Sequence, residues 1–284
     1  MTDELSQISA TARGAARSQD WAQVDACARE ILRRDNTSAE GYFLTGLVLK
    51  ASRKPAMAAQ SFEQALVLDA DRYDAAVELA NQYSIARRNG DTAALLAKYE
   101  EALGNSPMYL DLAGTVYVDI GLPERAWPLY KKATELQPGV DLFQANLAAC
   151  GVYLGKVEEA KEIYQALLQR FPGHRRNHYE LSRLEKAKDS THIEQMKQIL
   201  RGSDSPPDEN VFIYYAIGKE LEDLGQWQES FEFYQKAGDA VVSVADYDVA
   251  TDVQLMDTIM GVCSADWLAD AADACSADDS AKTP

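Results

Sequence analysis

Small and bulky apolar side chains recur along most of the chain at a regular interval. Small residues are spaced 34 positions apart, with a last step of 36, at Ala12, Gly46, Ala80, Gly114, Ala148, Ser182 and Gly218. A bulky aromatic follows most of them within the same interval, at Phe62, Tyr99, Tyr130, Tyr164 and Tyr234. Two antiparallel helices approach closely where one presents a small side chain, and an aromatic on the other fills the remaining space. The pattern therefore predicts repeated pairs of helices. Because no segment shows sustained strand alternation, we expect an all-α protein.

Glycines and prolines lie where such helix pairs would turn. Four glycines fall between the small residue and the aromatic, at Gly90, Gly121, Gly155 and Gly225. We expect them to end the first helix of their pair. Three prolines are expected to stop the second helix and begin the next connection, at Pro107, Pro138 and Pro172. Each pair leaves an apolar face uncovered, so about seven units must stack into a right-handed solenoid.

The order of these residues resembles a known repeat. The best segments are Tyr42-x2-Thr45-Gly46-x2-Leu49 with Ala58-x3-Phe62-x2-Ala65, Leu110-x2-Ala113-Gly114-x2-Tyr117 with Ala126-x3-Tyr130-x2-Ala133, and Tyr214-x2-Ile217-Gly218-x2-Leu221 with Ser230-x3-Tyr234-x2-Ala237. They are similar to the tetratricopeptide repeat (TPR) motif, with Thr45 standing where leucine is usual and Ser230 where alanine is usual. The resemblance covers residues 5–240. It implies a TPR solenoid that binds other proteins in a concave groove.

The C-terminal third also resembles the end of the repeat domain of bacterial TPR-sulfotransferases. This resemblance rests on residues 179–184, 217–225 and 231–234. In that family a helix like residues 247–263 leads into a catalytic domain, which opens with a strand and a glycine-containing loop for phosphoadenosine phosphosulfate. No segment like Pro-Arg-Ser-Gly-Thr-Thr occurs in this chain. The resemblance therefore implies the repeat part of such an enzyme without its catalytic domain.

The match to the motif and the composition divide the chain into four parts. Residues 1–38 depart from the motif and are expected to form a degenerate N-terminal capping repeat. Residues 39–240 form the predicted solenoid, with an irregular basic unit at 173–205. Residues 241–268 are predicted to supply a C-terminal capping helix. Its apolar stripe comprises Val249, Val253, Met256, Ile259 and Met260. Residues 269–284 are rich in Ala, Asp and Ser, and we expect a disordered acidic tail.

The charge balance and the cysteines narrow the class of protein. The 284 residues carry 28 Lys and Arg against 45 Asp and Glu, a formal net charge of −17. Such a chain repels phosphate backbones, so we predict no nucleic-acid partner. No apolar run approaches the roughly 20 residues that span a bilayer, so we predict a soluble chain without membrane insertion. The spacing of Cys27, Cys150, Cys263 and Cys275 suits neither a disulfide framework nor a metal-type pair, which favours a reducing, cytoplasmic compartment.

Candidate chemistry is sparse. His174 and His178 are spaced i, i+4 and could reach one metal, but no Cys or HExxH-type motif accompanies them. We interpret them, together with His192, as exposed histidines, and we predict no metal and no cofactor. Carboxylate pairs lie on helical surfaces without a His or Cys nucleophile pairing nearby. We therefore predict that the protein is not an enzyme.

The basic unit holds the candidate binding site. The first set of residues has the spacing of one helix face: Arg176, Tyr179, Arg183 and Lys186. The next first helix repeats this spacing with Phe212, Tyr215, Lys219 and Glu222. By analogy with the TPR family, both sets would face the concave groove, beside an apolar lining formed by residues 108–118 and by Leu142, Ala145, Ala149 and Val152. An apolar groove that ends in a basic wall suits an extended or helical peptide with acidic residues.

These features predict a non-enzymatic scaffold with a protein or peptide partner, an acidic one being favoured. Two alternatives stay open. In the first, the basic set has no partner and is simply a solvated charged face, since exposed charges contribute only about 0.2 to 1 kcal/mol each. Or the chain is the docking part of a TPR-sulfotransferase whose catalytic domain is missing or encoded separately, so that its partner is a sulfotransferase domain in cis or in trans.

Overall fold

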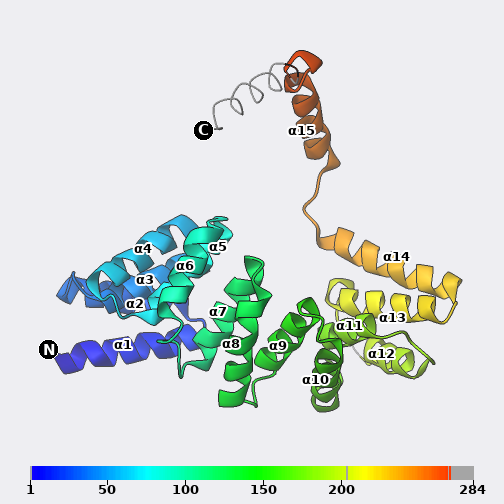
Figure 1. The fold of residues 1–284 in the computed structure, drawn as a ribbon, viewed down its shortest axis with the longest axis horizontal. Coiled ribbons are helices and arrows are strands. Elements are labelled where there is room, and N and C mark those ends of the chain that lie inside the picture. Colours follow the sequence, from blue (N-terminus) through cyan, green and yellow to red (C-terminus); the bar gives the residue numbers. More distant parts are fainter. Residues whose placement is uncertain (1, 203, 268, 270–284) are drawn as a thin grey trace, which may run out of the picture.

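The computed structural model describes residues 2–202, 204–267 and 269, and these residues form a chain of helices (Figure 1). The helices of the first half are α1 (Thr2–Arg17), α2 (Trp21–Arg34), α3 (Ala39–Ala51), α4 (Pro55–Leu68), α5 (Tyr73–Ile85), α6 (Asn89–Tyr99), α7 (Pro107–Asp119) and α8 (Pro123–Leu136). Those of the second half are α9 (Asp141–Tyr153), α10 (Val157–Arg170), α11 (Arg175–Leu184), α12 (Thr191–Arg201), the 3₁₀ helix η1 (Pro207–Asn210), α13 (Val211–Asp223), α14 (Trp227–Val244) and α15 (Val249–Val262). The described residues contain no strand. The all-α prediction is confirmed.

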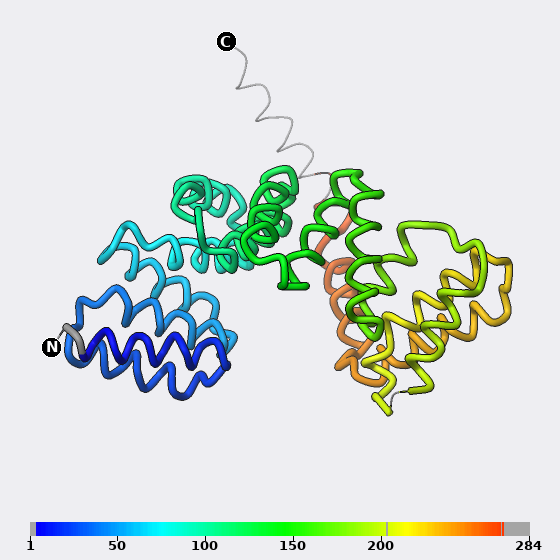
Figure 2. Tube along the Cα trace, turned by 90° about the horizontal axis from the view of Figure 1, so that it is seen from below, coloured from blue at the N-terminus to red at the C-terminus, as the bar shows by residue number. Residues whose placement is uncertain are grey.

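Consecutive helices pack in pairs from α1 with α2 to α13 with α14, except that α11 and α12 both pack against α13 rather than mainly against each other. Figures 1 and 2 show these pairs following one another in chain order from one end of the stack to the other. The pairs up to α14 match the predicted count of about seven units. The helix pair α1–α2 occupies the range expected for the N-terminal capping repeat, and the pair α11–α12 occupies the range of the irregular basic unit.

The periodic small residues lie where paired helices approach most closely. All seven are buried. At Gly46 an added Cβ would lie 2.4 Å from the Phe62 ring, and at Gly114 it would lie 2.9 Å from the Tyr130 ring. Gly218 meets Tyr234 in the same way, at 2.9 Å. The pairing of a small residue with an aromatic is therefore confirmed in three units.

In six of the described helix pairs, all but α11–α12, the turn between the two helices uses one left-handed residue. Gly121, Gly155 and Gly225 take this role with φ of +80°, +72° and +72°, as predicted. The expectation for Gly90 is wrong, because this glycine lies in the first turn of α6 and Arg87 is the left-handed residue, with φ +59°. Gln19 and Arg53 occupy the equivalent places in the first two units, with φ of +59° and +56°.

Prolines mark connections, with one departure from the prediction. Pro138 and Pro172 lie in the connections after α8 and α10. Pro107 does not stop a helix, because α6 has already ended at Tyr99, and it instead occupies the first turn of α7. This position suits proline, since the first N–H groups of a helix have no partner within it.

The buried apolar residues are unevenly distributed along the stack. One cluster runs without a break from Ala12 on α1 to Cys150 on α9. A small second cluster joins α9, α10 and α11 around Tyr164. A third joins α12, α13 and α14 around Ile193, Met196 and Ile217. The C-terminal units are thus held by less apolar contact than the N-terminal ones.

The predicted C-terminal capping helix forms, but it does not cap the stack. α15 has no buried residue, and the side chains of its apolar stripe are between 46% and 68% exposed. Figure 1 shows α15 standing away from α14. Residues 245–248, which connect α14 to α15, are not helical, and the Asp248 side chain caps α15 by accepting from the Ala250 N–H. The predicted tail, apart from residue 269, lies outside the described residues.

Candidate functional site on the first helices

The two predicted sets of residues meet where α11 packs against α13. The Tyr179 ring on α11 lies 5.5 Å from the Phe212 ring and 6.5 Å from the Tyr215 ring, both on α13. Tilted rings at such distances are favourable contacts. We call Tyr179, Phe212 and Tyr215 the aromatic cluster. It is extended towards α14 by Tyr234, whose ring lies 6.2 Å from that of Tyr215.

Two arginines lie over the aromatic cluster. The Arg176 guanidinium is 5.8 Å from the centre of the Phe212 ring, and that of Arg183 is 5.3 Å from the centre of the Tyr179 ring. Both also pair with Glu180, at 3.6 Å and 3.3 Å, while their side chains stay 66% and 55% exposed. Exposed pairs of this kind are weak. The guanidinium groups therefore keep donors that can reach a carboxylate brought by a partner.

The two lysines of the prediction have different surroundings. Lys219 Nζ donates to Asp223 Oδ2 at 2.6 Å and to the Glu185 carbonyl at 2.5 Å. Burial raises the pKa of the Asp223 carboxyl, but hydrogen bonds from Lys219 and from the Ala187 N–H outweigh this and lower it. Lys219 thus ties the segment after α11 to α13. Lys186 lies in that segment, because α11 ends at Leu184, so the prediction that it shares a helix face with Arg176 is wrong.

Exposed apolar side chains continue the site along the earlier first helices. The equivalent position near the start of each first helix holds Met108 on α7, Leu142 on α9, Arg176 on α11 and Phe212 on α13. The three apolar members are 57%, 61% and 40% exposed. We call this row together with the aromatic cluster and Arg183 the first-helix face. It presents a nearly regular series of apolar side chains, interrupted by the arginine.

A pocket of about 240 Å³ opens between α9 and α11 on this face. Part of the predicted apolar lining forms one wall of it, with Leu142, Ala145 and Ala149, and Arg176 and Glu180 lie on the other side. Asn146 also borders it and donates to Asp111 on α7 at 2.9 Å. Burial raises the pKa of the Asp111 carboxyl. The pocket is suited to one apolar side chain with a polar group at its end.

Other cations of the basic unit have structural partners. Arg175 donates to Asn210 Oδ1 and to Ser205 Oγ, at 2.8 Å and 3.0 Å. Lys197 pairs with Glu229 on α14 at 2.7 Å. The excess positive charge that the composition indicated is therefore partly used to hold the irregular unit together.

A chain of buried polar groups runs beneath the basic unit, and the sequence did not reveal it. His178 Nε2 lies 2.7 Å from the Pro172 carbonyl, and its Nδ1 lies 2.7 Å from His192 Nε2. His192 Nδ1 in turn lies 2.6 Å from Glu220 Oε1. We call these groups the histidine chain. The prediction of exposed histidines is wrong for His178, which is 2% exposed because it lies on the buried side of α11 beside Leu181.

The hydrogen bonds fix the protons of the histidine chain. The Pro172 carbonyl can only accept, so His178 Nε2 carries a proton and donates it. Burial lowers the pKa of His178 to about 4, against the weaker opposing effect of the Pro172 bond. The neutral ring therefore accepts at Nδ1 from His192 Nε2–H.

The predicted pairing of His174 with His178 does not occur. His174 caps α11 and accepts from the Asn177 N–H at Nδ1. The described part of the chain contains no group of three or more His, Cys, Asp or Glu side chains placed to hold a metal ion. Nor does any described helix have the length and apolar composition needed to cross a membrane.

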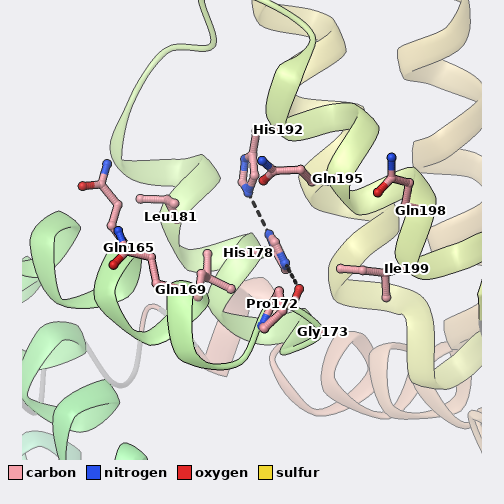
Figure 3. Close-up of a pocket in the computed structure, with 11 residues that line it drawn as sticks. Gln165, Gln169, Pro172, Gly173, His178, Leu181, His192, Gln195, Gln198 and Ile199 are labelled. Carbon is pink, nitrogen blue, oxygen red and sulfur yellow. Dashed lines mark hydrogen bonds between the residues drawn. The ribbon is translucent and has the colours of Figure 1, made fainter.

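A second pocket of about 730 Å³ lies beside the histidine chain (Figure 3). Two glutamines of α10 and two of α12 border it: Gln165, Gln169, Gln195 and Gln198. Figure 3 shows His192, His178 and Pro172 in line between these two helices. The described side chains that line this pocket carry no Asp, Glu, Lys or Arg. It is a polar but formally neutral surface.

Comparison with known proteins bears on the fold. No protein-family model and no curated protein matches the sequence. A tetratricopeptide repeat protein from Parabacteroides merdae ATCC 43184 is similar in structure, with a TM-score of 0.55, 13% identity, and coverage of 91% of this chain and 99% of that chain. PilF of Pseudomonas aeruginosa is also similar in structure, with a TM-score of 0.51, 14% identity, and coverage of 83% of this chain and 98% of that chain. A human IFIT1 dimer with PPP-AAAA has a TM-score of 0.54 and 19% identity, with coverage of 77% of this chain and 54% of that chain.

With the helix pairs and their packing, these likenesses confirm the predicted TPR solenoid fold. At such low identity they carry nothing further about this chain. The resemblance to sulfotransferases stays a prediction.

Proposed function

We propose that this chain is a non-enzymatic cytoplasmic scaffold that binds a segment of a partner protein on its first-helix face. The observation that carries the proposal is the aromatic cluster with Arg176 and Arg183 over it, next to a row of exposed apolar side chains. Tyrosine and arginine are enriched among residues that dominate binding energy. A surface that combines them with apolar side chains has the composition of a recognition site.

The same arrangement favours an acidic segment over a nucleic acid. The chain as a whole carries a net charge of −17 and repels anions. An acidic partner would therefore be steered towards the local positive charge of Arg176, Arg183 and Lys186. A phosphate backbone needs many cations along its length. The first-helix face as defined above contains two cations, Arg176 and Arg183, and both pair with Glu180.

The test is selection of peptides of about fifteen residues against the full chain, followed by affinity measurement on the enriched sequences. We expect peptides that combine carboxylates with apolar residues. The double variant Arg183→Glu, Phe212→Ala should bind them at least about tenfold more weakly, the loss of about 1.4 kcal/mol expected for a hot spot. Arg201→Glu, a similar charge change on α12, serves as the control. Equal binding by both variants would contradict the proposal.

The sequence resemblance at residues 179–234 favours a second candidate, a docking part for a sulfotransferase catalytic domain. Such a domain would occupy the same end of the stack. The two candidates differ in their partner, because only the second requires a transferase domain bound in cis or in trans. Calorimetry with phosphoadenosine phosphosulfate should show no saturable binding to the purified chain, whereas low micromolar binding would contradict the non-enzymatic role.

A further inference from the structure

α15 is a free helix with a largely apolar surface. Its apolar side chains recur at i, i+3 and i+4, which places them on one side: Val249, Val253, Met256, Ile259 and Met260. Each of them is at least 46% exposed. A soluble protein rarely leaves such a row uncovered unless it binds something.

The segment that carries α15 is also strongly acidic. Residues 245–267 contain no Lys, Arg or His, and their carboxylates are Asp246, Asp248, Asp252, Asp257 and Asp266. The segment is therefore an apolar, acidic, helical peptide. This is the chemistry that the first-helix face is proposed to bind.

The dimensions of the two surfaces agree. At 1.5 Å per residue, the 14 residues of α15 extend about 21 Å. Neighbouring packed helices such as α11 and α13 are about 8 to 10 Å apart, and a pocket separates α9 from α11, so the face from α9 to α13 extends at least roughly 16 to 20 Å. α15 lying across these helices could place apolar side chains against Leu142 and Phe212, with a carboxylate beside Arg176 or Arg183.

Resting on the function proposed above, we infer that the first-helix face takes α15 of a second copy of this chain. Within one chain the geometry is unfavourable. Tyr247 donates to Asp252 at 2.5 Å and Asp248 caps α15, so Ala245 and Asp246 are the loose residues of the connection. Two residues span at most about 7 Å. The acidic first turn of α15 therefore stays near α14, roughly two helix spacings from Arg176 and Arg183 on α11.

A second copy has no such restriction. Each copy can give its α15 and receive that of the other, which produces two identical contacts and a closed symmetric dimer. Long-range repulsion between two chains of −17 opposes the dimer. It is screened beyond about 8 Å at physiological ionic strength, whereas the apolar contact is not.

The test measures the molar mass of the full chain by light scattering from 1 to 100 µM. We expect a dimer that dissociates on dilution. Ile259→Asp on the apolar side of α15, and separately Phe212→Asp on the first-helix face, should each weaken it at least tenfold. Thr258→Asp, on the polar side of α15, is the matched control and should leave the dimer intact. Circular dichroism checks that every variant stays helical.

Mixing the two weakened variants identifies the contact. One intact α15 and one intact first-helix face then remain in the pair, so a mixed dimer should form where neither variant dimerises alone. The inference would be overturned by a chain that stays monomeric at all concentrations, or by a dimer whose dissociation is unchanged by both substitutions. It would also be overturned if chemical crosslinking joined α15 to the first-helix face of its own chain. Peptide binding on the first-helix face, measured with the Ile259→Asp variant, tests the proposed function separately and can succeed while the dimer fails.

Discussion

The N-terminal units and the C-terminal units have the same fold but are stabilised differently. From α1 to α9 one continuous apolar cluster links every helix pair. From α11 to α14 the apolar cluster is small, and polar contacts such as the histidine chain and the hydrogen bond from Lys219 to the Glu185 carbonyl join the elements. Segments with fewer buried apolar contacts open more readily. The aromatic cluster with Arg176 and Arg183 thus lies on the part of the stack that has the smaller free energy of opening.

Buried charge is also arranged differently in the two regions. The N-terminal units contain a cluster of two arginines and two carboxylates, in which Arg72 pairs with Glu40 at 2.8 Å and Asp74 at 2.7 Å. These side chains keep their charge near neutral pH. The C-terminal units use the histidine chain instead, in which burial lowers the pKa of His178 to about 4. The comparison therefore predicts different sensitivities to mutation and to pH.

The largest expected effect is the removal of Arg72. Its side chain is 10% exposed, and it also lies 4.5 Å from the centre of the Phe43 ring. Arg72→Met would leave Glu40 and Asp74 with less compensation, and breaking a buried pair in this way costs about 3 to 5 kcal/mol. Arg33→Met, which removes an exposed pair with Glu30, is the control and should leave the unfolding midpoint nearly unchanged. Urea unfolding followed by circular dichroism compares them, and similar midpoints would contradict the importance of the cluster.

The next effect is acid sensitivity of the C-terminal units. The pKa of His178 is about 4 in the folded chain, below the unfolded value of about 6.5, so the folded state binds fewer protons between these values. The contribution of His178 to the free energy of unfolding is therefore fully present above pH 6.5. About 3 kcal/mol of it is lost as the pH falls towards 4. Hydrogen exchange should show α11 to α13 opening in this window. His178→Phe should remove most of that pH dependence.

The N-terminal units should respond in a lower window. Burial raises the pKa of Glu40, but hydrogen bonds from Arg13 and Ser9 outweigh it and lower the value to about 2. Its contribution is present above pH 4.5 and is lost as pH falls towards 2. Glu78, whose pKa burial raises, acts in the opposite direction. Equal acid sensitivity of α3 to α5 and of α11 to α13 between pH 6.5 and 4.5 would contradict the comparison.

A third, intermediate effect concerns the close approach of paired helices. Gly114→Leu places a bulky side chain where a Cβ alone would lie 2.9 Å from the Tyr130 ring. We expect a cost of about 1 to 3 kcal/mol from overpacking. Gly139→Leu is the control, because a Cβ there meets nothing within 4 Å. Denaturant unfolding of both variants measures the difference, and an unchanged Gly114→Leu protein would mean that the assigned helix contact is absent.

The fold could be predicted from the sequence because its contacts are local and periodic. Gly46 and Phe62 belong to one helix pair, so their spacing records their contact directly. The histidine chain joins His178, His192 and Glu220 across an irregular unit, and no fixed spacing marks such a contact. The placement of Lys186 depended on where α11 ends. The apolar stripe of α15 indicates that the helix packs against some apolar surface, but the stripe does not identify that surface.

The smallest expected effect tests the left-handed turn residue in both regions. Arg53 adopts φ +56°, which costs an L-residue with a side chain about 1 to 2 kcal/mol. Arg53→Gly should relieve this cost, but the unfolded chain gains about 0.5 to 1 kcal/mol of conformational freedom, so the net gain is about 0.5 kcal/mol. In the C-terminal region the reverse change, Gly225→Ala at φ +72°, should cost a similar amount, because an added Cβ would meet only Trp227 Nε1, at an ordinary 3.9 Å, so that the backbone conformation is the main effect. Thermal unfolding of both variants against wild type provides the measurement. Opposite shifts are expected, and shifts of the same sign would mean that the turn conformation does not control stability at these positions.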